Sequence, residues 1–232
     1  MKKILALCLA LVLVCSVSSA FAAGKLSVEQ ENFYVINDYR LYGYTFAKVA
    51  NVGNRPIVVN TALLEIYDAN GDALTSTDYY SDPAKYLQPD EYTYIKIYDE
   101  IEDVEASAVD DYLLTVIGKA NSDYVTKRFP CTTSYEPNVK RDYWTYNYMY
   151  ATITNDTDET VYGIYVVLAL LDAEGNILYV TTDNLYSNTG LTAGSSVTVR
   201  ENVDSSFIEY FETNGIVPVT VDAIAYVYVS ND

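Results

Sequence analysis

The residues of this sequence best suited to a chemical role are aromatic side chains spaced two apart. They form two strips: Tyr42, Tyr44 and Phe46 in the first, and Trp144, Tyr146, Tyr148 and Tyr150 in the second. Alternate residues of a β-strand share one face, so each strip predicts a row of rings on a sheet. Such a row can stack on sugars or pack against a partner protein. The same rings can instead lie in a core or between two domains.

The second strip is the stronger candidate for a partner-binding surface. Trp144 is the only tryptophan of the chain, and Arg40 stands at the equivalent place before the first strip. If one half of the chain binds and the other acts as a spacer, the tryptophan favours the second half.

Catalysis has little support in the sequence. The chain contains no histidine, which removes the usual general base and the commonest zinc ligand. Cys131 therefore has no histidine to activate it. Phosphate-loop, dinucleotide-binding and G-x-S-x-G patterns are also missing. We predict that the protein is not an enzyme and uses no cofactor, with a pair of carboxylates acting as a glycoside hydrolase as the remote alternative.

A calcium site is the other chemical alternative. Asp68, Asn70 and Asp72 alternate like the start of a calcium-binding loop. Such a loop needs glycine at its sixth position and glutamate at its twelfth. Here Gly71 is fourth, where a hairpin turn requires it, so we predict ordinary turn chemistry and no metal.

The elements that carry both strips form an internal repeat. Segments 42–74 and 146–178 match without a gap at an offset of 104 residues, through nine identical positions. They are Tyr42, Tyr44, Ala47, Asn51, Leu64, Asp68, Ala69, Gly71 and Leu74. A repeat of this length is the size of a domain. Each segment is predicted to form a hairpin.

Strands are predicted within each hairpin and on both sides of it. Their ranges are 25–38, 42–50, 57–67, 92–98, 112–118 and 124–129 in the first half, and 146–154, 161–171, 196–202 and 223–229 in the second. The apolar run 164–171 is typical of a central, buried strand. Segment 130–141 is interpreted as a connection. One helix is predicted at 206–214, with Ser206 and Glu209 spaced as a capping box.

Short strands separated by turn signals predict an all-β fold made of two tandem immunoglobulin-like antiparallel β-sandwich domains, with a short helix in the second. We expect a signal peptide at 1–22, repeat 1 at 25–129 and repeat 2 at 130–232. The N-terminus has the pattern of a secretory signal: the basic Lys2 and Lys3, a short apolar run, and the small residues Ala20 and Ala22 before the cleavage site. The run is too short for a membrane anchor.

Without the signal, twelve basic residues stand against thirty-two acidic ones, a net charge of −20. That charge argues against nucleic acid or an anionic membrane as partner. With Cys131 as the sole remaining cysteine, no intramolecular disulfide can form. We expect a secreted or cell-surface protein that is not inserted in the membrane.

Two segments resemble the signature of the FxLYD domain family. Residues 64–71 read LEIYDANG and residues 168–175 read LALLDAEG, and each copy has an upstream strand that ends in asparagine, Asn51 or Asn155. Leucine replaces the phenylalanine of the signature in both copies. The resemblance implies small extracytoplasmic bacterial β-sandwich modules without a known catalytic site.

The functional prediction is an exported, non-catalytic binding or adhesion module that recognises a protein or glycan at the cell surface. Its candidate partner-binding residues are Trp144, Tyr146, Tyr148, Tyr150, Tyr42 and Tyr44. The alternative is a structural or accessory subunit that joins itself or a partner through tyrosine-rich faces. An exposed flat strip favours assembly, whereas a strip in a concave groove beside acids favours glycan binding.

Overall fold

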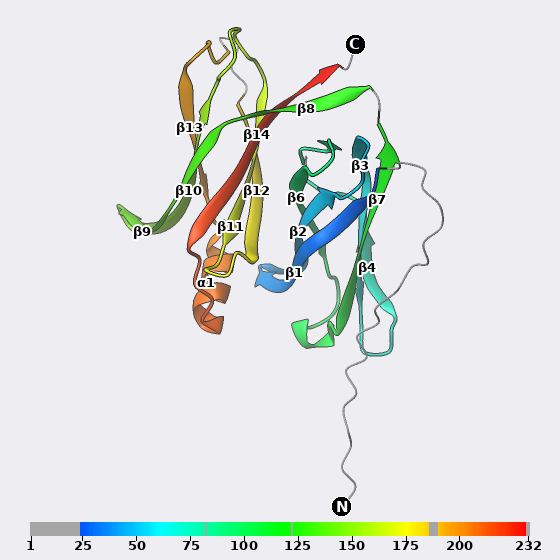
Figure 1. Ribbon diagram of the computed structural model, residues 1–232. Helices are drawn as coiled ribbons and strands as arrows, with labels where there is room; N and C mark the ends of the chain where they lie inside the picture. The colour runs from blue at the N-terminus through cyan, green and yellow to red at the C-terminus, as the bar shows by residue number, and fades with distance from the viewer. Residues whose placement is uncertain (1–23, 82, 122, 186–189, 231–232) are drawn as a thin grey trace, which may run out of the picture.

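A computed structural model describes residues 24–81, 83–121, 123–185 and 190–230 (Figure 1). The expected signal peptide at 1–22 lies outside these residues. Strands make up most of the regular structure. The described residues also form helix α1 (Ser205–Asn214) and a short 3-10 helix, η1 (Ala106–Ala108). Within the described ranges, no helix is long and apolar enough to cross a bilayer.

The strands form four antiparallel sheets, which we name A to D. Sheet A contains β1 (Leu26–Asp38), β2 (Arg40–Asn51) and β6 (Tyr92–Glu100). Sheet B contains β4 (Ala73–Thr77), β3 (Ile57–Tyr67), the short β5 (Tyr86–Leu87) and β7 (Asp111–Ala120). Sheet C contains β12 (Ile177–Leu185), β11 (Ile164–Leu171), β14 (Thr220–Ser230) and β8 (Tyr124–Phe129). Sheet D contains β13 (Ser196–Asn202), β10 (Trp144–Thr154) and β9 (Cys131–Arg141).

The sheets stack in the order B, A, C, D (Figure 1). Sheets A and B form the sandwich of repeat 1, and sheets C and D form that of repeat 2, so the predicted all-β sandwich fold is confirmed. Leu64, Ile66 and Ile95 are completely buried between A and B, and Met149 and Leu168 are completely buried between C and D. The outer face of sheet A packs against sheet C.

The predicted hairpins 42–74 and 146–178 are wrong in their pairing. β2 pairs with β1 and β6, whereas β3 pairs with β4, β5 and β7, so the turn after Asn51 carries the chain from one sheet to the other. The same holds for β10 and β11. The local hairpins are β3–β4 and β11–β12, whose turns contain Gly71 and Gly175 at φ +84° as predicted. Two strands that are adjacent in sequence can pair across a turn or face each other across a sandwich, and their apolar patterns are the same.

Segment 130–141 is a strand rather than the connection that the sequence indicated. β9 lies at an edge of sheet D and hydrogen-bonds to β10 in the register Met149↔Tyr135. Pro137 and the left-handed Asn138 interrupt it beside a bulge, and proline is tolerated in a sheet mainly at such edges. The preceding strand, β8, is hydrogen-bonded to β14 of sheet C. Residues 124–129, which the sequence placed at the end of repeat 1, thus pair with repeat 2.

The predicted helix is present, but its capping box is not formed. The N-cap is Asp204, and no side-chain hydrogen bond caps the helix. The Asp204 carboxylate instead accepts a hydrogen bond from the hydroxyl of Tyr179 at 2.9 Å. Gly215 ends the helix in the left-handed conformation, as expected. Phe207 and Phe211 are buried, so tertiary packing holds this helix in place.

A buried asparagine fixes the sheet-to-sheet turn in each repeat. The Asn51 side-chain amide donates to the carbonyls of Arg55 and Leu87 at 2.8 and 3.0 Å. Asn155, 104 residues later, donates to the carbonyls of Glu159 and Leu191 at 2.8 and 2.7 Å. Both asparagines are completely buried. The repeat therefore extends to hydrogen bonds that join distant segments of each sandwich.

Candidate interaction surface

The two aromatic strips lie on equivalent strands but in different surroundings. β2 and β10 are each the middle strand of their sheet, and in each the strip is on the face turned away from the core of its own sandwich. The face of β2 is covered by repeat 2, whereas the face of β10 is the outermost face of the four layers (Figure 1).

The strip of repeat 1 contributes to the interface between the repeats. The Tyr44 ring lies 5.0 Å from that of Phe207, and the Phe46 ring lies 5.5 Å from that of Tyr179. Phe46 is completely buried, and burial raises the pKa of Tyr44 to about 12. Tyr42 is half-buried and touches Tyr44, with ring centroids 5.9 Å apart. Of the two candidate residues in this strip, Tyr44 thus contacts repeat 2 directly.

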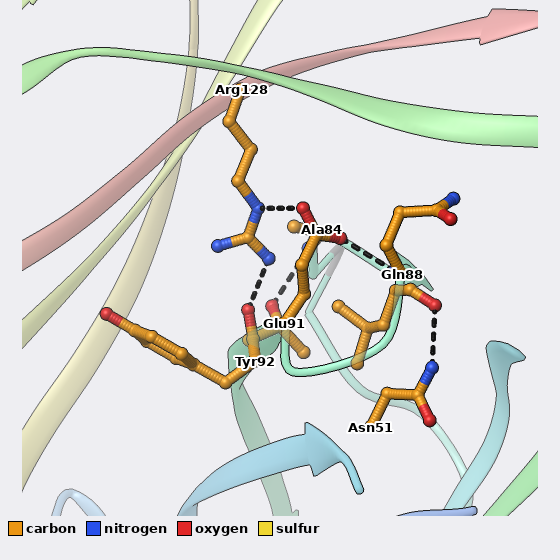
Figure 2. A network of polar contacts seen from close by, with 8 residues as sticks. Asn51, Ala84, Gln88, Glu91, Tyr92 and Arg128 are labelled. Carbon is orange, nitrogen blue, oxygen red and sulfur yellow. Dashed lines mark hydrogen bonds and ion pairs between the residues drawn. The ribbon is translucent and has the colours of Figure 1, made fainter. Parts of the chain in front are cut away.

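Polar groups add specific bonds to the same interface. The Asp222 carboxylate on β14 accepts hydrogen bonds from the hydroxyls of Tyr92 and Tyr94 on β6, each at 2.8 Å. Arg128 on β8 donates to the Tyr92 carbonyl at 2.5 Å and lies 3.3 Å from the Glu91 carboxylate (Figure 2). Burial raises the pKa of Tyr92 to about 12, and the hydrogen bond to Asp222 acts in the same direction. These contacts fix how the two sandwiches sit on each other.

The strip of repeat 2 forms a ladder of rings on the outer face of sheet D. The rings of Tyr146 and Tyr148 stack at 5.3 Å with an angle of 8°, and Tyr150 lies 6.0 Å beyond Tyr148. The guanidinium of Arg200 sits 4.5 Å from the Tyr148 ring centre, and that of Arg141 sits 5.5 Å from it. Tyr148 is only 6% exposed because these neighbours cover it. The other two rings are half-buried.

Trp144 lies at the start of β10, beside the tip of the β9–β10 hairpin. It is 70% exposed, and the preceding Tyr143 is 98% exposed. Two adjacent exposed aromatic side chains extend the row of rings into a larger patch, and contiguous apolar patches mark interaction sites. The four candidate residues of this strip therefore lie together, from the hairpin tip to the middle of the sheet.

We name this surface the D face. Besides the strip it includes the residues that the β-ladders place on the same side of sheet D, which are Arg141, Glu136, Arg200, Thr152 and Thr198. Glu136 accepts a hydrogen bond from the Tyr150 hydroxyl at 2.9 Å. Desolvation raises the pKa of Tyr150, and this hydrogen bond acts in the same direction. Thr152 and Thr198 share a hydrogen bond at 2.8 Å. An ordered, partly cationic aromatic face is thus exposed on a strongly acidic chain.

Arg141 and Arg200 were not identified from the sequence as residues of the site. Arg200 is the cross-strand partner of Tyr150, and it stands 104 residues after Lys96. The Lys96 ammonium lies 5.6 Å from the Tyr44 ring centre, in the same role. A comparison of equivalent positions in the repeats would have found Arg200, whereas Arg141 depends on the β9 pairing that the sequence did not predict.

The acidic turn considered for calcium uses its carboxylate within the turn. One Asp68 oxygen accepts the backbone N–H groups of Asn70 and Asp72, both at 2.9 Å, and the other accepts the Asn70 amide at 3.1 Å. These bonds lower the pKa of Asp68. Asp172 accepts the equivalent backbone N–H groups in repeat 2, and its side-chain donor is the amide of Asn176. Among the described residues, no three acidic or cysteine side chains converge to form a metal site.

A cavity of about 680 Å³ opens on repeat 1, away from both strips. The β1–β2 hairpin and the β6–β7 connection line it, with Arg40, Glu100, Glu102, Asp103 and Glu105 among the lining residues. The Arg40 guanidinium is bound to Glu100 at 2.6 Å. None of the residues that line this cavity belongs to either aromatic strip.

Comparison with known proteins assigns no family. No family model matches the chain, and no curated protein matches it. A solved structure of the T13 viral particle of IBDV, an icosahedral virus, contains a chain that is 11% identical over 90% of this chain, with a TM-score of 0.18. This chain spans 65% of the length of that one. So low a TM-score carries no argument about fold or function.

Proposed function

We propose that the protein is an exported, non-catalytic binding module and that the D face is its partner-binding surface. One observation carries this proposal: of two equivalent aromatic strips, one joins the repeats, whereas the other lies on an outer face that no other sheet covers, with the exposed Trp144 at its end. The same ring chemistry that forms a stable interface in repeat 1 is thus available for a partner in repeat 2.

The geometry of the rings favours a protein partner over a glycan. Tyr146 and Tyr148 stack on each other, and Arg200 covers Tyr148, so these ring faces are already occupied. A sugar that stacks on an aromatic ring needs an open ring face, whereas a protein partner can pack on ring edges and bond to hydroxyls and guanidinium groups. Tyrosine and arginine are the residues that most often dominate protein interfaces.

Export and the FxLYD resemblance are parts of the same proposal. The N-terminal segment has the pattern of a secretory signal, and the repeat carries motifs similar to those of extracytoplasmic modules. Cleavage after Ala22 would be detected by N-terminal sequencing of the protein recovered from the medium or cell surface of its host.

The binding test uses the chain without residues 1–22 and three probes: insoluble peptidoglycan, mucin, and mucin stripped of its glycans. A Trp144→Ala/Tyr146→Ala/Arg200→Ala variant should lose saturable binding by at least about tenfold. The matched control is Tyr39→Ala/Tyr79→Ala/Arg55→Ala, which removes exposed residues of the same kinds elsewhere. Binding that survives glycan removal indicates a protein partner. Equal binding by the variant and its control would contradict the assignment of the D face.

A further inference from the structure

The interface between the repeats joins unlike faces. Repeat 1 uses the outer face of sheet A, whose equivalent in repeat 2 is the outer face of sheet D. Repeat 2 uses the outer face of sheet C, whose equivalent in repeat 1 is the outer face of sheet B. A contact between unlike faces is heterologous, so each repeat keeps the face that its partner uses as an unused face. The unused faces are the D face and the outer face of sheet B, at the two ends of the stack (Figure 1).

The outer face of sheet B, which we name the B face, carries exposed apolar side chains. Leu113 and Ile117 on β7 are 50% and 52% exposed. Their cross-strand partners on β3 are Glu65 and Thr61, and Leu63 lies between these two, opposite Thr115. A sheet face with this many exposed β-branched and leucine side chains is suited to packing against another sheet.

The B face corresponds by position to the surface that already accepts an aromatic strip. Leu63 stands 104 residues before Val167, and Thr61 stands 104 residues before Tyr165, both on the face of β11 that is turned toward repeat 1. In the paired strands, Ile117 occupies the position of Tyr226, which is completely buried in sheet C. The template for a strip-to-sheet contact is therefore present within the chain.

Charge is also complementary between the two ends. In the internal interface the outer face of β1 lies against α1, where the Tyr34 ring is 5.4 Å from that of Tyr210. The equivalent of α1 in repeat 1 is the β6–β7 connection, with Glu102 and Glu105 exposed. The hairpin that would face it on the D side carries Lys140, Arg141 and Asp142, all exposed, a net charge of +1 opposite the acidic connection. Opposite charges at the rim of a contact promote association and fix its orientation.

We infer that the D face binds the B face of a second copy of this chain, and that copies join head to tail in an open series. This inference rests on the proposed function, since it names the partner of the same surface. Each added copy repeats the order B, A, C, D, so that sheet D of one molecule lies on sheet B of the next. Both tyrosine strips then have one role, within the chain and between chains.

The test is sedimentation velocity of the chain without residues 1–22, at concentrations up to about 1 mM. The D-face variant is Arg141→Glu/Arg200→Glu, and the B-face variant is Leu113→Lys/Ile117→Lys; each changes exposed residues on one face alone. Their controls are Arg55→Glu/Lys127→Glu and Val217→Lys/Val219→Lys, which make the same changes at exposed positions elsewhere. Circular dichroism confirms that each variant is folded.

We expect the unmodified chain and both controls to sediment faster as concentration rises and to exceed the size of a dimer. Each face variant should remain a monomer by itself. An equimolar mixture of the two variants should form dimers and nothing larger, because one intact D face then meets one intact B face. If Leu113→Lys/Ile117→Lys fails to fold, Glu102→Lys/Glu105→Lys takes its place. Mixed with the D-face variant, it should restore association, because the positive and negative charges at the rim of the contact are then exchanged between the two faces.

An unmodified chain that stays monomeric at about 1 mM overturns the inference. The inference is also overturned if the B-face variant still forms a closed dimer, because the D face of one copy would then bind the D face of another. The proposed function fails separately, when the chain binds a mucin or peptidoglycan probe and the D-face alanine variant binds that probe as its control does. A monomeric chain that binds one of those probes through the D face leaves the proposed function intact and refutes the second copy as partner.

Discussion

The bonds of Asp222 provide the sharpest test of how the repeats are joined. Replacing Asp222 by alanine removes the acceptor shared by the hydroxyls of Tyr92 and Tyr94, each 2.8 Å away. A hydrogen bond to a charged group contributes about 1.5–3 kcal/mol. Tyr92 is half-buried and can regain part of this from water, so we expect the substitution to lower the free energy of unfolding by about 2–4 kcal/mol.

A double-mutant cycle separates the bonds from other effects of the substitution. Urea unfolding is measured for Asp222→Ala, for Tyr92→Phe/Tyr94→Phe and for the triple variant. We expect a coupling energy of about 1.5–3 kcal/mol, because either change already removes the same bonds. Asp158→Ala, at an exposed turn, is the control and should change stability by less than about 0.5 kcal/mol. Additivity within about 0.5 kcal/mol would refute the role of these bonds.

Four further outcomes are expected. Asn155→Ala should lower the free energy of unfolding by about 2–4 kcal/mol, since it removes both bonds that the buried amide donates and the acceptor of the Thr157 N–H; a loss below about 1 kcal/mol in urea unfolding would argue against the clamp. Phe46→Ala should cost about 3–5 kcal/mol and its counterpart Tyr150→Ala about 1 kcal/mol or less, and equal losses would mean that both strips are equally buried. Stability should fall from about pH 10 to about pH 12, because the unfolded chain loses tyrosine protons that folded Tyr92 keeps; a flat urea midpoint over this range, followed together with tyrosinate absorbance, would contradict this. A chelator should leave the melting temperature unchanged, because the Asp68 oxygens are bonded within the turn, and a drop in that temperature would indicate a bound cation.

Local sequence signals predicted the class of fold and several of its turns. The glycine turns at 68–71 and 172–175 require positive φ, and a four-residue signal is sufficient to identify them. Strand β11 was predictable because sheets on both sides leave no polar position from Val166 to Leu170. Helix α1 was predictable from the shared face of Phe207 and Phe211.

Pairing across the sandwich could not be predicted in the same way. Segment 42–74 has two apolar strands and a turn whether the strands pair or face each other, and the buried Asn51 selects the second arrangement through the distant Leu87 carbonyl. β9 escaped detection because an edge strand with one solvated face and Pro137 within it has little apolar periodicity.

The candidate residues were predictable, but their burial was not. Tyr44 and Tyr148 are equivalent by sequence, and only the structure shows what covers each: Phe207 of repeat 2 packs on Tyr44, whereas arginines of its own sheet cover Tyr148. The partner of Tyr44 on β1 is Tyr34, whereas that of Tyr148 on β9 is Glu136. Tyr94 on β6 is likewise replaced by Thr198 on β13. The outer face of sheet A, which repeat 2 covers, is aromatic on all three of its strands. The D face is aromatic along β10 alone and has polar residues on both neighbouring strands.

Hydrogen exchange of the unmodified chain, compared at low and high protein concentration, shows directly whether the D face and the B face of different copies meet. We expect peptides from β10 and β13 on one end, and from β3 and β7 on the other, to exchange more slowly at high concentration, while those of the internal A–C interface do not change. Slower exchange confined to other strands, with the D face unaffected at every concentration, would mean that the copies do not join through these faces.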